Sequence, residues 1–421
     1  MNEKGLGEMG VERRLVELEG DPAQRGTNAH VRVCMFIWRL DQVGGAEKYV
    51  PRLARAIARL GAEVVICSPF RERAFQDDDD LSFIRLPTFD WLPRYVGGAA
   101  FLFVALLSLI RARRRYDLIH AHGLSSVALA ATIAGTFLGK PVIAQAHGAG
   151  MTGDVSILGR SWLRSLRRRL LMRVDRYVAL TDQIRSELLG LGLDGRRVVT
   201  IPNAVDTSVF YPWVGDRRAL RRKLGLSEED KVVIFVGRLD PVKRVDLLIR
   251  GLRQVRERIP EARLVLVGDG PLRSELEQIV VKLGLDSSVI FAGNRPDVAA
   301  YMQASDMFVL PSESEGLSIA LLEAMACGLP VLVSDCDGNR ELVTDGLDGM
   351  VFPRGNEKVL AQKIETVLLD TVCAQRLAQA AVEKVQSQFR LESVAARFLE
   401  LYETVVGTRA VPQGVRARRH G

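Results

Sequence analysis

Short apolar segments rich in β-branched residues recur along the chain, and each is followed by a segment with a helical apolar period. Continuous apolar strands that alternate with helices are typical of a parallel sheet covered on both faces. The pattern predicts two series of strands. The first series is 31–38, 62–68, 83–87, 117–123, 140–148, 175–181 and 198–202, and the second is 231–239, 262–270, 288–294, 307–312, 330–335 and 349–353.

The two series meet near Pro202, which Pro212 follows. A chain of 421 residues is also too long for one ordinary core. We therefore predict two doubly wound α/β domains that resemble Rossmann folds, with ligands bound at the carboxyl ends of the strands. The predicted parts are a tail at 1–28, a Rossmann-like domain at 29–205, a second Rossmann-like domain at 206–388, a helix at 389–407 that packs back on the first domain, and a basic tail at 408–421.

Composition excludes several classes of protein but does not identify a ligand. Hydrophobic residues make up 48% of the chain, which excludes disordered, collagen-like and coiled-coil classes for most of its length. The formal charge of +7 permits a nucleotide, a membrane surface or a nucleic acid as an anionic partner. Five cysteines without a Cys-x-x-Cys pair, and no N-terminal apolar stretch, indicate a reduced cytoplasmic protein.

The strongest motif is PSESEGLSIALLEAMACGLPV, residues 311–331. Glu315 and Gly316 are expected to open a helix that also carries Glu323, which would place both carboxylates within about 80° of one helical face. A helix N-terminus there would attract a phosphate, and the second carboxylate could accept from ribose hydroxyls. Taken singly, Glu315 could be a helix stabiliser and Glu323 a solvated residue.

This motif resembles the Glu-x(7)-Glu signature of retaining GT-B glycosyltransferases, in particular glycosyltransferase family 4, and the resemblance covers nearly all of residues 31–406. It implies two Rossmann-like domains that face each other across a cleft. By resemblance the donor, a nucleotide sugar, would bind the C-terminal domain at 206–388, and the acceptor would bind the N-terminal domain at 29–205. No cofactor or metal would be needed. By resemblance Glu315 contacts the donor sugar, Glu323 holds the ribose, and Gly316, Leu317 and Ser318 belong to the donor site.

A second motif, FVGRLDPVKR at 235–244, places two cations directly after a strand. Gly237 ends the strand, and Arg238 and Lys243 could grip a diphosphate from two sides. In the family this pair neutralises the leaving diphosphate. The alternative is two ordinary surface cations, and the position directly after a strand argues against it. Arg244 stands where the family often has Gly.

Two weaker motifs follow later strands of the second series. Gly268 and Gly270 resemble the family's Gly-x-Gly-Pro turn, and the resemblance assigns the nucleobase to the backbone near Arg295 and Val298. Each is weak evidence by itself, because a tight strand–helix turn would use the same residues.

In the segment at 334–341 the family usually has a Gly-Gly pair, but here Gly338 is followed by Asn339. Asn tolerates left-handed backbone angles, so we expect the turn to survive. Glu341 is expected to begin a helix.

In the first series, Gly44 and Gly45 would let a ligand approach backbone amides, although an ordinary strand–helix turn is an equal alternative. His120, His122 and His147 end two strands. No Cys, Glu or Asp cluster completes a metal site around them. We expect His147, and more weakly His122, to contact the sugar on the acceptor side, and His120 to be structural.

Residues 91–115 and 159–176 combine apolar residues with many arginines, which suits an anionic membrane surface. Helices that simply cover the first sheet are an equal alternative, and the apolar run at 96–110 is too short to span a bilayer. Nucleic acid is not expected, because no aromatic stacking platform accompanies the arginines.

We therefore predict a retaining, metal-independent hexosyltransferase that uses a uridine- or guanosine-linked sugar and a glycan or lipid-linked acceptor, in cell-surface polysaccharide or glycolipid biosynthesis. Three alternatives stay open. They are a nucleotide-sugar epimerase or phosphorylase on the same scaffold, a non-catalytic nucleotide-sugar-binding component of a membrane assembly, and a membrane scaffold.

Overall fold

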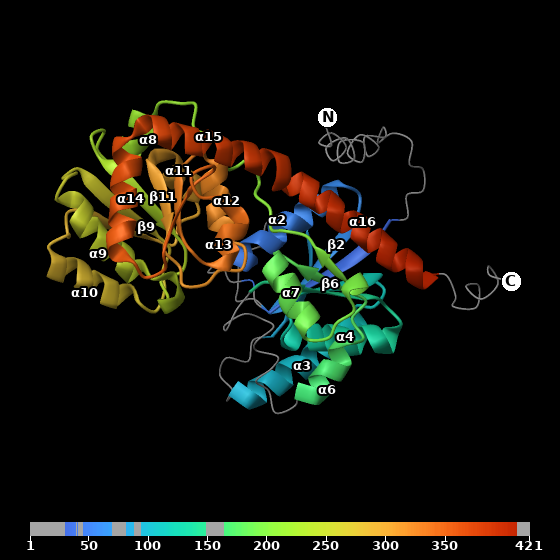
Figure 1. Cartoon of the computed structure of the whole chain (residues 1–421). Helices are drawn as coiled ribbons and strands as arrows, with labels where there is room; N and C mark the ends of the chain where they lie inside the picture. Colours follow the sequence, from blue (N-terminus) through green and yellow to red (C-terminus); the bar gives the residue numbers. More distant parts are fainter. Residues whose placement is uncertain are drawn as a thin grey trace, which may run out of the picture. The chain divides into compact units, whose positions relative to one another are not determined.

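The computed structural model describes residues 30–38, 40, 45–69, 81–87, 94–148 and 164–410. Two parallel sheets lie one after the other along the chain, within a compact unit that begins at Val31 (Figure 1). The predicted α/β fold with two Rossmann-like sheets is confirmed, and every predicted strand is present with ends that differ by a few residues.

The first sheet has the order β3-β2-β1-β4-β5-β6-β7. Its order reverses between β1 and β4, so the connections that follow these two paired strands run in opposite directions. Open α/β sheets bind ligands at the carboxyl edge beside such a point. Its strands are β1 (Arg32–Ile37), β2 (Glu63–Pro69), β3 (Ser82–Leu86), β4 (Leu118–His122), β5 (Val142–Ala146), β6 (Arg176–Ala179) and β7 (Val198–Thr200). Its helices are α2 (Gly45–Arg59), α3 (Arg94–Arg111), α4 (Ser126–Leu138), α6 (Arg164–Leu171) and α7 (Asp182–Gly190), with the 3-10 turn η3 (Gly195–Arg197).

The second sheet repeats this plan with the order β10-β9-β8-β11-β12-β13, and its order reverses beside β8. Its strands are β8 (Lys231–Val236), β9 (Ala262–Val267), β10 (Val289–Gly293), β11 (Met307–Leu310), β12 (Val331–Ser334) and β13 (Met350–Phe352). Its helices are α8 (Arg217–Lys223), α9 (Val245–Arg256), α10 (Arg273–Leu283), α11 (Val298–Ala304), α12 (Ile319–Ala326), α13 (Asp337–Leu342), α14 (Glu357–Leu369) and α15 (Thr371–Gln388), with the 3-10 turn η4 (Pro241–Lys243).

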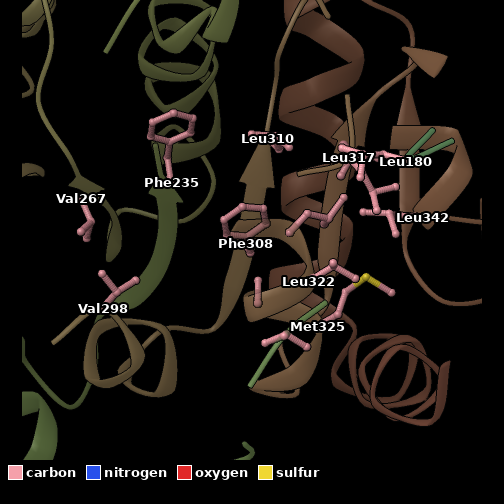
Figure 2. Close-up of a cluster of buried hydrophobic side chains, with 14 of the residues drawn as sticks. Leu180, Phe235, Val267, Val298, Phe308, Leu310, Leu317, Leu322, Met325 and Leu342 are labelled. Carbon is pink, nitrogen blue, oxygen red and sulfur yellow. The ribbon is translucent and has the colours of Figure 1, made fainter. Parts of the chain in front are cut away.

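The core of the second domain fixes helix α12 on the sheet. Phe235 of β8 and Phe308 of β11 are fully buried, and Figure 2 shows them in one cluster with Leu322 and Met325 of α12. Burying a side chain of this size stabilises the fold by about 1.5–3 kcal/mol. The apolar residues of α12 therefore fix the helix on the sheet, and Glu323 lies between them in the sequence.

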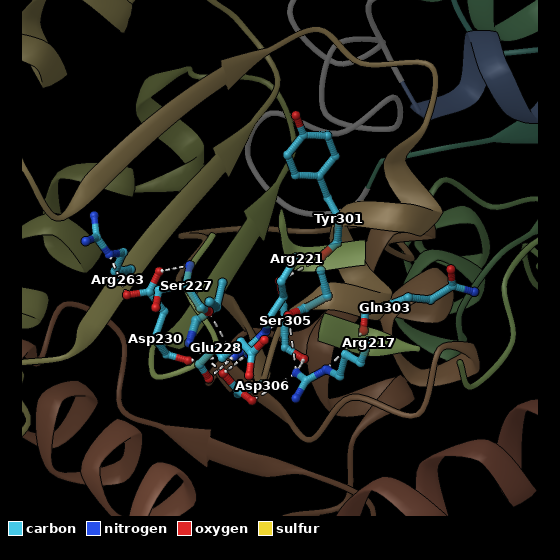
Figure 3. Close-up of polar contacts among 12 residues, drawn as sticks. Arg217, Arg221, Ser227, Glu228, Asp230, Arg263, Tyr301, Gln303, Ser305 and Asp306 are labelled. Atoms are coloured by element: carbon cyan, nitrogen blue, oxygen red, sulfur yellow. Dashed lines mark hydrogen bonds and ion pairs between the residues drawn. The ribbon is translucent and has the colours of Figure 1, made fainter. Parts of the chain in front are cut away.

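A polar network ties the opposite edge of this sheet together (Figure 3). Asp306, just before β11, accepts from Arg217 at 2.9 Å and from Arg221 at 2.7 Å, both on α8. It also accepts from the backbone amide of Val232 at 2.6 Å. One carboxylate thus joins α8 to the two central strands.

Helix α16 (Leu391–Ala410) packs on α2 of the first domain (Figure 1). Its Phe398 and Tyr402 are buried in the same apolar cluster as Met35 of β1. At the crossing, the Val205 amide donates to Phe389 O at 2.9 Å, and the Leu391 amide donates to Val205 O at 3.0 Å. The chain therefore connects the two domains by two adjacent segments.

The arginine-rich stretches fall partly outside the described residues, at 91–93 and 159–163. Helix α3 buries Phe101, Ala105 and Leu109 in the first domain's core, whereas Phe103 is 68% exposed. No helix in the described part of the chain has both the length and the apolar character needed to cross a membrane. Contact with a membrane surface, and a cytoplasmic location, stay predictions.

Candidate active site

A hollow of about 470 Å³ opens at the carboxyl ends of strands from both sheets. Its walls come from α2 and the residue after β5 in the first domain, and from the segments after β8, β9, β10 and β11 in the second. This is the edge at which doubly wound sheets bind ligands. Of the residues expected in the site, the hollow is lined by Gly45, His147, Gly237, Arg238, Lys243, Gly268, Arg295, Val298, Glu315, Gly316, Leu317, Ser318 and Glu323.

Three residues of the predicted site do not line the hollow or cannot be placed. Gly44 lies outside the described residues. Gly270 is close to the hollow but packs against backbone, and His122 is buried behind His147.

The two cations after β8 differ in their partners. Lys243 Nζ lies 2.6 Å from Glu315 Oε1, which also accepts from Ser312 Oγ at 2.5 Å. Within the described residues, the Arg238 guanidinium forms neither a hydrogen bond nor an ion pair, although it lines the hollow. Of these two cations, an anion in the hollow therefore meets one without an ion-pair partner among the described residues and one that is shared with a carboxylate.

The expected helix start at Glu315 is wrong. Helix α12 begins at Ile319, where the Ser318 side chain caps it by accepting from the Leu321 amide at 3.3 Å. Glu315 and Gly316 lie in the preceding bend, so the two glutamates do not share a helical face. Ser is a preferred N-cap residue, and this signal would have placed the start correctly.

Glu323 is buried, and Arg52 of α2 donates to its Oε1 at 2.7 Å. Burial raises the pKa of this carboxyl, while the nearby charges of Arg52 and Lys48 lower it. Sequence reasoning missed both cations. Lys48, Arg52 and Arg55 follow Gly45 at helical spacing and line the hollow, which is the signal that could have found them.

Three glycines of the predicted site are required by close backbone packing. A Cβ on Gly268, which has φ +131°, would lie 1.9 Å from Gly237 O. A Cβ on Gly316 would lie 2.1 Å from the carbonyl oxygen of His147 in the first domain. Gly316 therefore permits the two domains to touch beside the hollow. Gly270 permits a close approach within the second domain, because its Cβ would lie 2.4 Å from Leu239 O.

The segment at 334–341 differs from expectation in two ways. Asn339 is helical rather than left-handed, and its buried amide donates to Ser334 O at 3.0 Å. Glu341 lies near the end of α13, not at its start, because the helix begins at Asp337. Its carboxylate accepts from the backbone amides of Asp182 at 2.9 Å and Gln183 at 3.3 Å, so it caps α7 of the other domain. By contrast Arg244, where the family often has Gly, does adopt a left-handed φ of 50°.

The three histidines form a stacked row that leads away from the hollow. The ring centroids of His120 and His122 are 4.1 Å apart, and those of His122 and His147 are 5.6 Å apart. His120 Nδ1 lies 2.7 Å from Tyr402 Oη of α16. Among the described residues no group of His, Cys, Asp and Glu has the arrangement of a metal site.

Acidification is expected to destabilise the first domain through this row. Burial lowers the pKa of His120 to about 3, so its ring stays neutral when folded but gains a proton at about pH 6.5 when unfolded. The unfolded state binds more protons between these values, so stability falls as pH drops. We expect His120 to contribute a loss of about 2 kcal/mol between pH 7 and pH 5.

The measurement is urea unfolding of the wild type and His120→Gln at both pH values. The variant should lose less stability on acidification than the wild type, whatever its stability at pH 7. His30→Gln, at an exposed histidine, is the control. Equal pH dependence in wild type and His120→Gln would contradict the prediction.

Together, two Rossmann-like sheets with a cation-lined hollow at their carboxyl edges form the GT-B architecture, which two-domain glycosyltransferases share. The comparisons agree with this class. Residues 43–209 match Glycosyltransferase Family 4, and residues 216–384 match Glycosyl transferases group 1. The chain belongs to glycosyltransferase family 4.

Curated relatives bear the names of enzymes that transfer sugars. The chain is 32% identical over 333 residues, 73% of its length and 77% of the relative's, to a D-inositol 3-phosphate glycosyltransferase 2 of Catenulispora acidiphila. It is 28% identical over 297 residues, 70% of its length and 76% of the relative's, to the N-acetyl-alpha-D-glucosaminyl L-malate synthase of Bacillus anthracis. Among solved structures, Anabaena Alr3699/HepE in complex with UDP and glucose superposes with a TM-score of 0.76 at 23% identity, over 89% of this chain and 100% of that one, which supports the fold.

Proposed function

We propose that this protein transfers a hexose from a nucleotide-diphosphate sugar to an acceptor hydroxyl, with retention of anomeric configuration and without a metal. The observation that carries the proposal is the uncommitted Arg238 beside the Lys243–Glu315 pair, at the carboxyl end of β8. Negative charge develops on the diphosphate as the sugar leaves, and preorganised cations at that point lower the barrier. The names of relatives that transfer sugars, and a structural neighbour with bound UDP-glucose, support a nucleotide-sugar donor.

In this proposal each domain has its own role. Arg238 and Lys243 bind the diphosphate, Glu323 accepts from the ribose hydroxyls, and Glu315 contacts the donor sugar. His147 contacts the sugar from the acceptor-side domain, and the nucleobase lies against Arg295 and Val298, which line the same hollow. Retention comes from the family resemblance, with the donor phosphate taking the proton of the acceptor hydroxyl.

The acceptor is proposed to be a glycan or a lipid-linked molecule in cell-surface polysaccharide or glycolipid biosynthesis. The relatives named for L-malate and for D-inositol 3-phosphate make small anionic acceptors a necessary part of any screen. A first assay should therefore offer all of these classes with the same donor and follow sugar transfer by mass spectrometry.

A nucleotide panel tests the donor directly. We expect UDP or GDP, and the matching nucleotide sugar, to raise the melting temperature by about 5–10 °C at a hundredfold excess over Kd. The matching nucleoside monophosphate should stabilise much less, because it cannot span Arg238 and Lys243. Sugar release from the same nucleotide sugar separates an enzyme from a pure binder. Absence of stabilisation by every nucleotide would reject the proposed function.

A further inference from the structure

The ion pair between Arg52 and Glu323 joins residues that lie 271 positions apart in the chain. Arg52 projects from α2 of the first domain, and Glu323 from α12 of the second, where the two helices contact each other. Arg52 Nη1 donates to Glu323 Oε1 at 2.7 Å, and both side chains line the hollow. The carboxylate expected to bind the donor ribose is thus held by the opposite wall of the site.

The guanidinium is held from a second side by an aromatic ring. Its central carbon lies 5.3 Å from the centroid of Phe210, which is a cation–π distance. The Arg52 side chain is 30% exposed, and that of Glu323 is 11% exposed. These two contacts restrict the rotamers that the Arg52 side chain can adopt. The restricted guanidinium in turn orients the Glu323 carboxylate.

The cationic side chains that face Glu323 in the described structure favour the ionised form of its carboxyl group. From α2 they are Arg52 and Lys48, and both counter the burial that raises the pKa of the carboxyl. From α12 itself the nearby titratable group is Cys327, whose thiol is neutral because burial raises its pKa above the physiological range. Without Arg52, Lys48 would be the one nearby charge among the described residues that opposes the cost of burying the carboxylate.

We propose that Arg52 is a positioning residue for donor binding, which keeps the Glu323 carboxylate ionised and aimed at the ribose hydroxyls. This inference rests on the proposed function, in which Glu323 accepts from the ribose. Arg52 uses one lone pair of Oε1, so a carboxylate with about four acceptor sites retains capacity for two hydroxyl donors. Donor affinity then depends on the first domain, because the ribose site is complete only while α2 lies against α12.

The test compares Arg52→Met, Arg52→Lys and Arg59→Met by calorimetric titration with UDP-glucose, or with GDP-mannose if the wild type selects guanosine. The diphosphate of these probes stays ionised from pH 5.5 to pH 8.5, so the pH dependence reports on the protein. Arg59 is exposed on the last turn of the same helix and is the matched control.

Arg52→Met should require a higher pH for tight binding, because Glu323 protonates more readily without its cation. Each pH unit of displacement corresponds to about a tenfold weaker Kd on the acid side. Arg52→Lys should restore most of the wild-type profile, and Arg59→Met should match the wild type. In turnover assays Arg52→Met should raise KM more than it lowers kcat.

The 2′-deoxyribose form of the donor gives a second readout. It should bind the wild type more weakly than the ribose form, and the difference should shrink in Arg52→Met, since both changes remove the same interaction. A merely structural role of Arg52 would weaken both donors equally at all pH values.

The outcomes separate the two proposals. If the wild type binds no nucleotide sugar, the proposed function fails and the inference with it. If the wild type binds and turns over its donor but Arg52→Met has the same pH profile and the same preference for ribose, only the inference fails.

Discussion

Arg238→Ala is expected to lower kcat/KM for the nucleotide sugar by about 10²–10³-fold, which is the usual effect of removing one preorganised donor from a developing charge. The Arg238 side chain is exposed in the hollow and forms no hydrogen bond or ion pair with any described residue, so its removal breaks none of the described polar interactions of the fold. We therefore expect an unchanged melting temperature. The measurements are steady-state kinetics and a thermal melt of the same preparation.

Lys243→Ala should lower turnover to a similar extent but should also lower the melting temperature. Its partner Glu315 has a side chain that is only 8% exposed, and it would be left with the Ser312 hydroxyl as its hydrogen-bond donor. Lys243→Ala combined with Glu315→Gln should recover stability without recovering activity. Arg253→Ala, at an exposed arginine of α9, is the neutral control. Normal turnover in both Arg238→Ala and Lys243→Ala would reject the diphosphate assignment.

The largest expected loss of stability comes from Arg221→Met, far from the hollow. The Arg221 side chain is 6% exposed and pairs with Asp306 at 2.7 Å (Figure 3). Its guanidinium also donates to the carbonyl oxygens of Ala304 at 2.9 Å, Glu228 at 3.0 Å and Asp230 at 2.9 Å. Removing one partner of a buried pair costs about 3–5 kcal/mol. Asp306 would keep Arg217 as a partner, but the three carbonyl oxygens would lose this donor.

The adjacent residue supplies a matched control for this substitution. Arg222 pairs with Glu228 at 3.1 Å, but its side chain is 63% exposed. Arg222→Met should therefore change stability by no more than about 1 kcal/mol. Thermal melts followed by circular dichroism would show the difference as a fall of roughly 10 °C for Arg221→Met. Equal melting temperatures for the two variants would show that the network of Asp306 does not stabilise the domain.

Much of the donor side of the site was predictable from sequence because its motifs are contiguous. Gly237, Arg238 and Lys243 follow one strand directly, and a parallel sheet brings every such strand end to the same edge. The error at Glu315 has a local cause. The strand β11 ends at Leu310 and the chain forms a bend before Ser318 caps α12, so residues read as helix are loop. The turn predicted at Asn339 is wrong because this residue lies in the short helix α13.

The sequence by itself determined the two parallel sheets, their strands and the motifs at their carboxyl ends, because hydrophobic period and turn residues are local properties of the chain. Only the tertiary structure decided the partners of the charged groups. Glu323 meets Arg52, Glu341 caps the helix that begins at Asp182, and Gly316 meets the carbonyl of His147. Each of these contacts joins the two domains across a long stretch of chain. A hydrogen bond requires atoms within about 3 Å of each other, and distance along the sequence does not encode that separation.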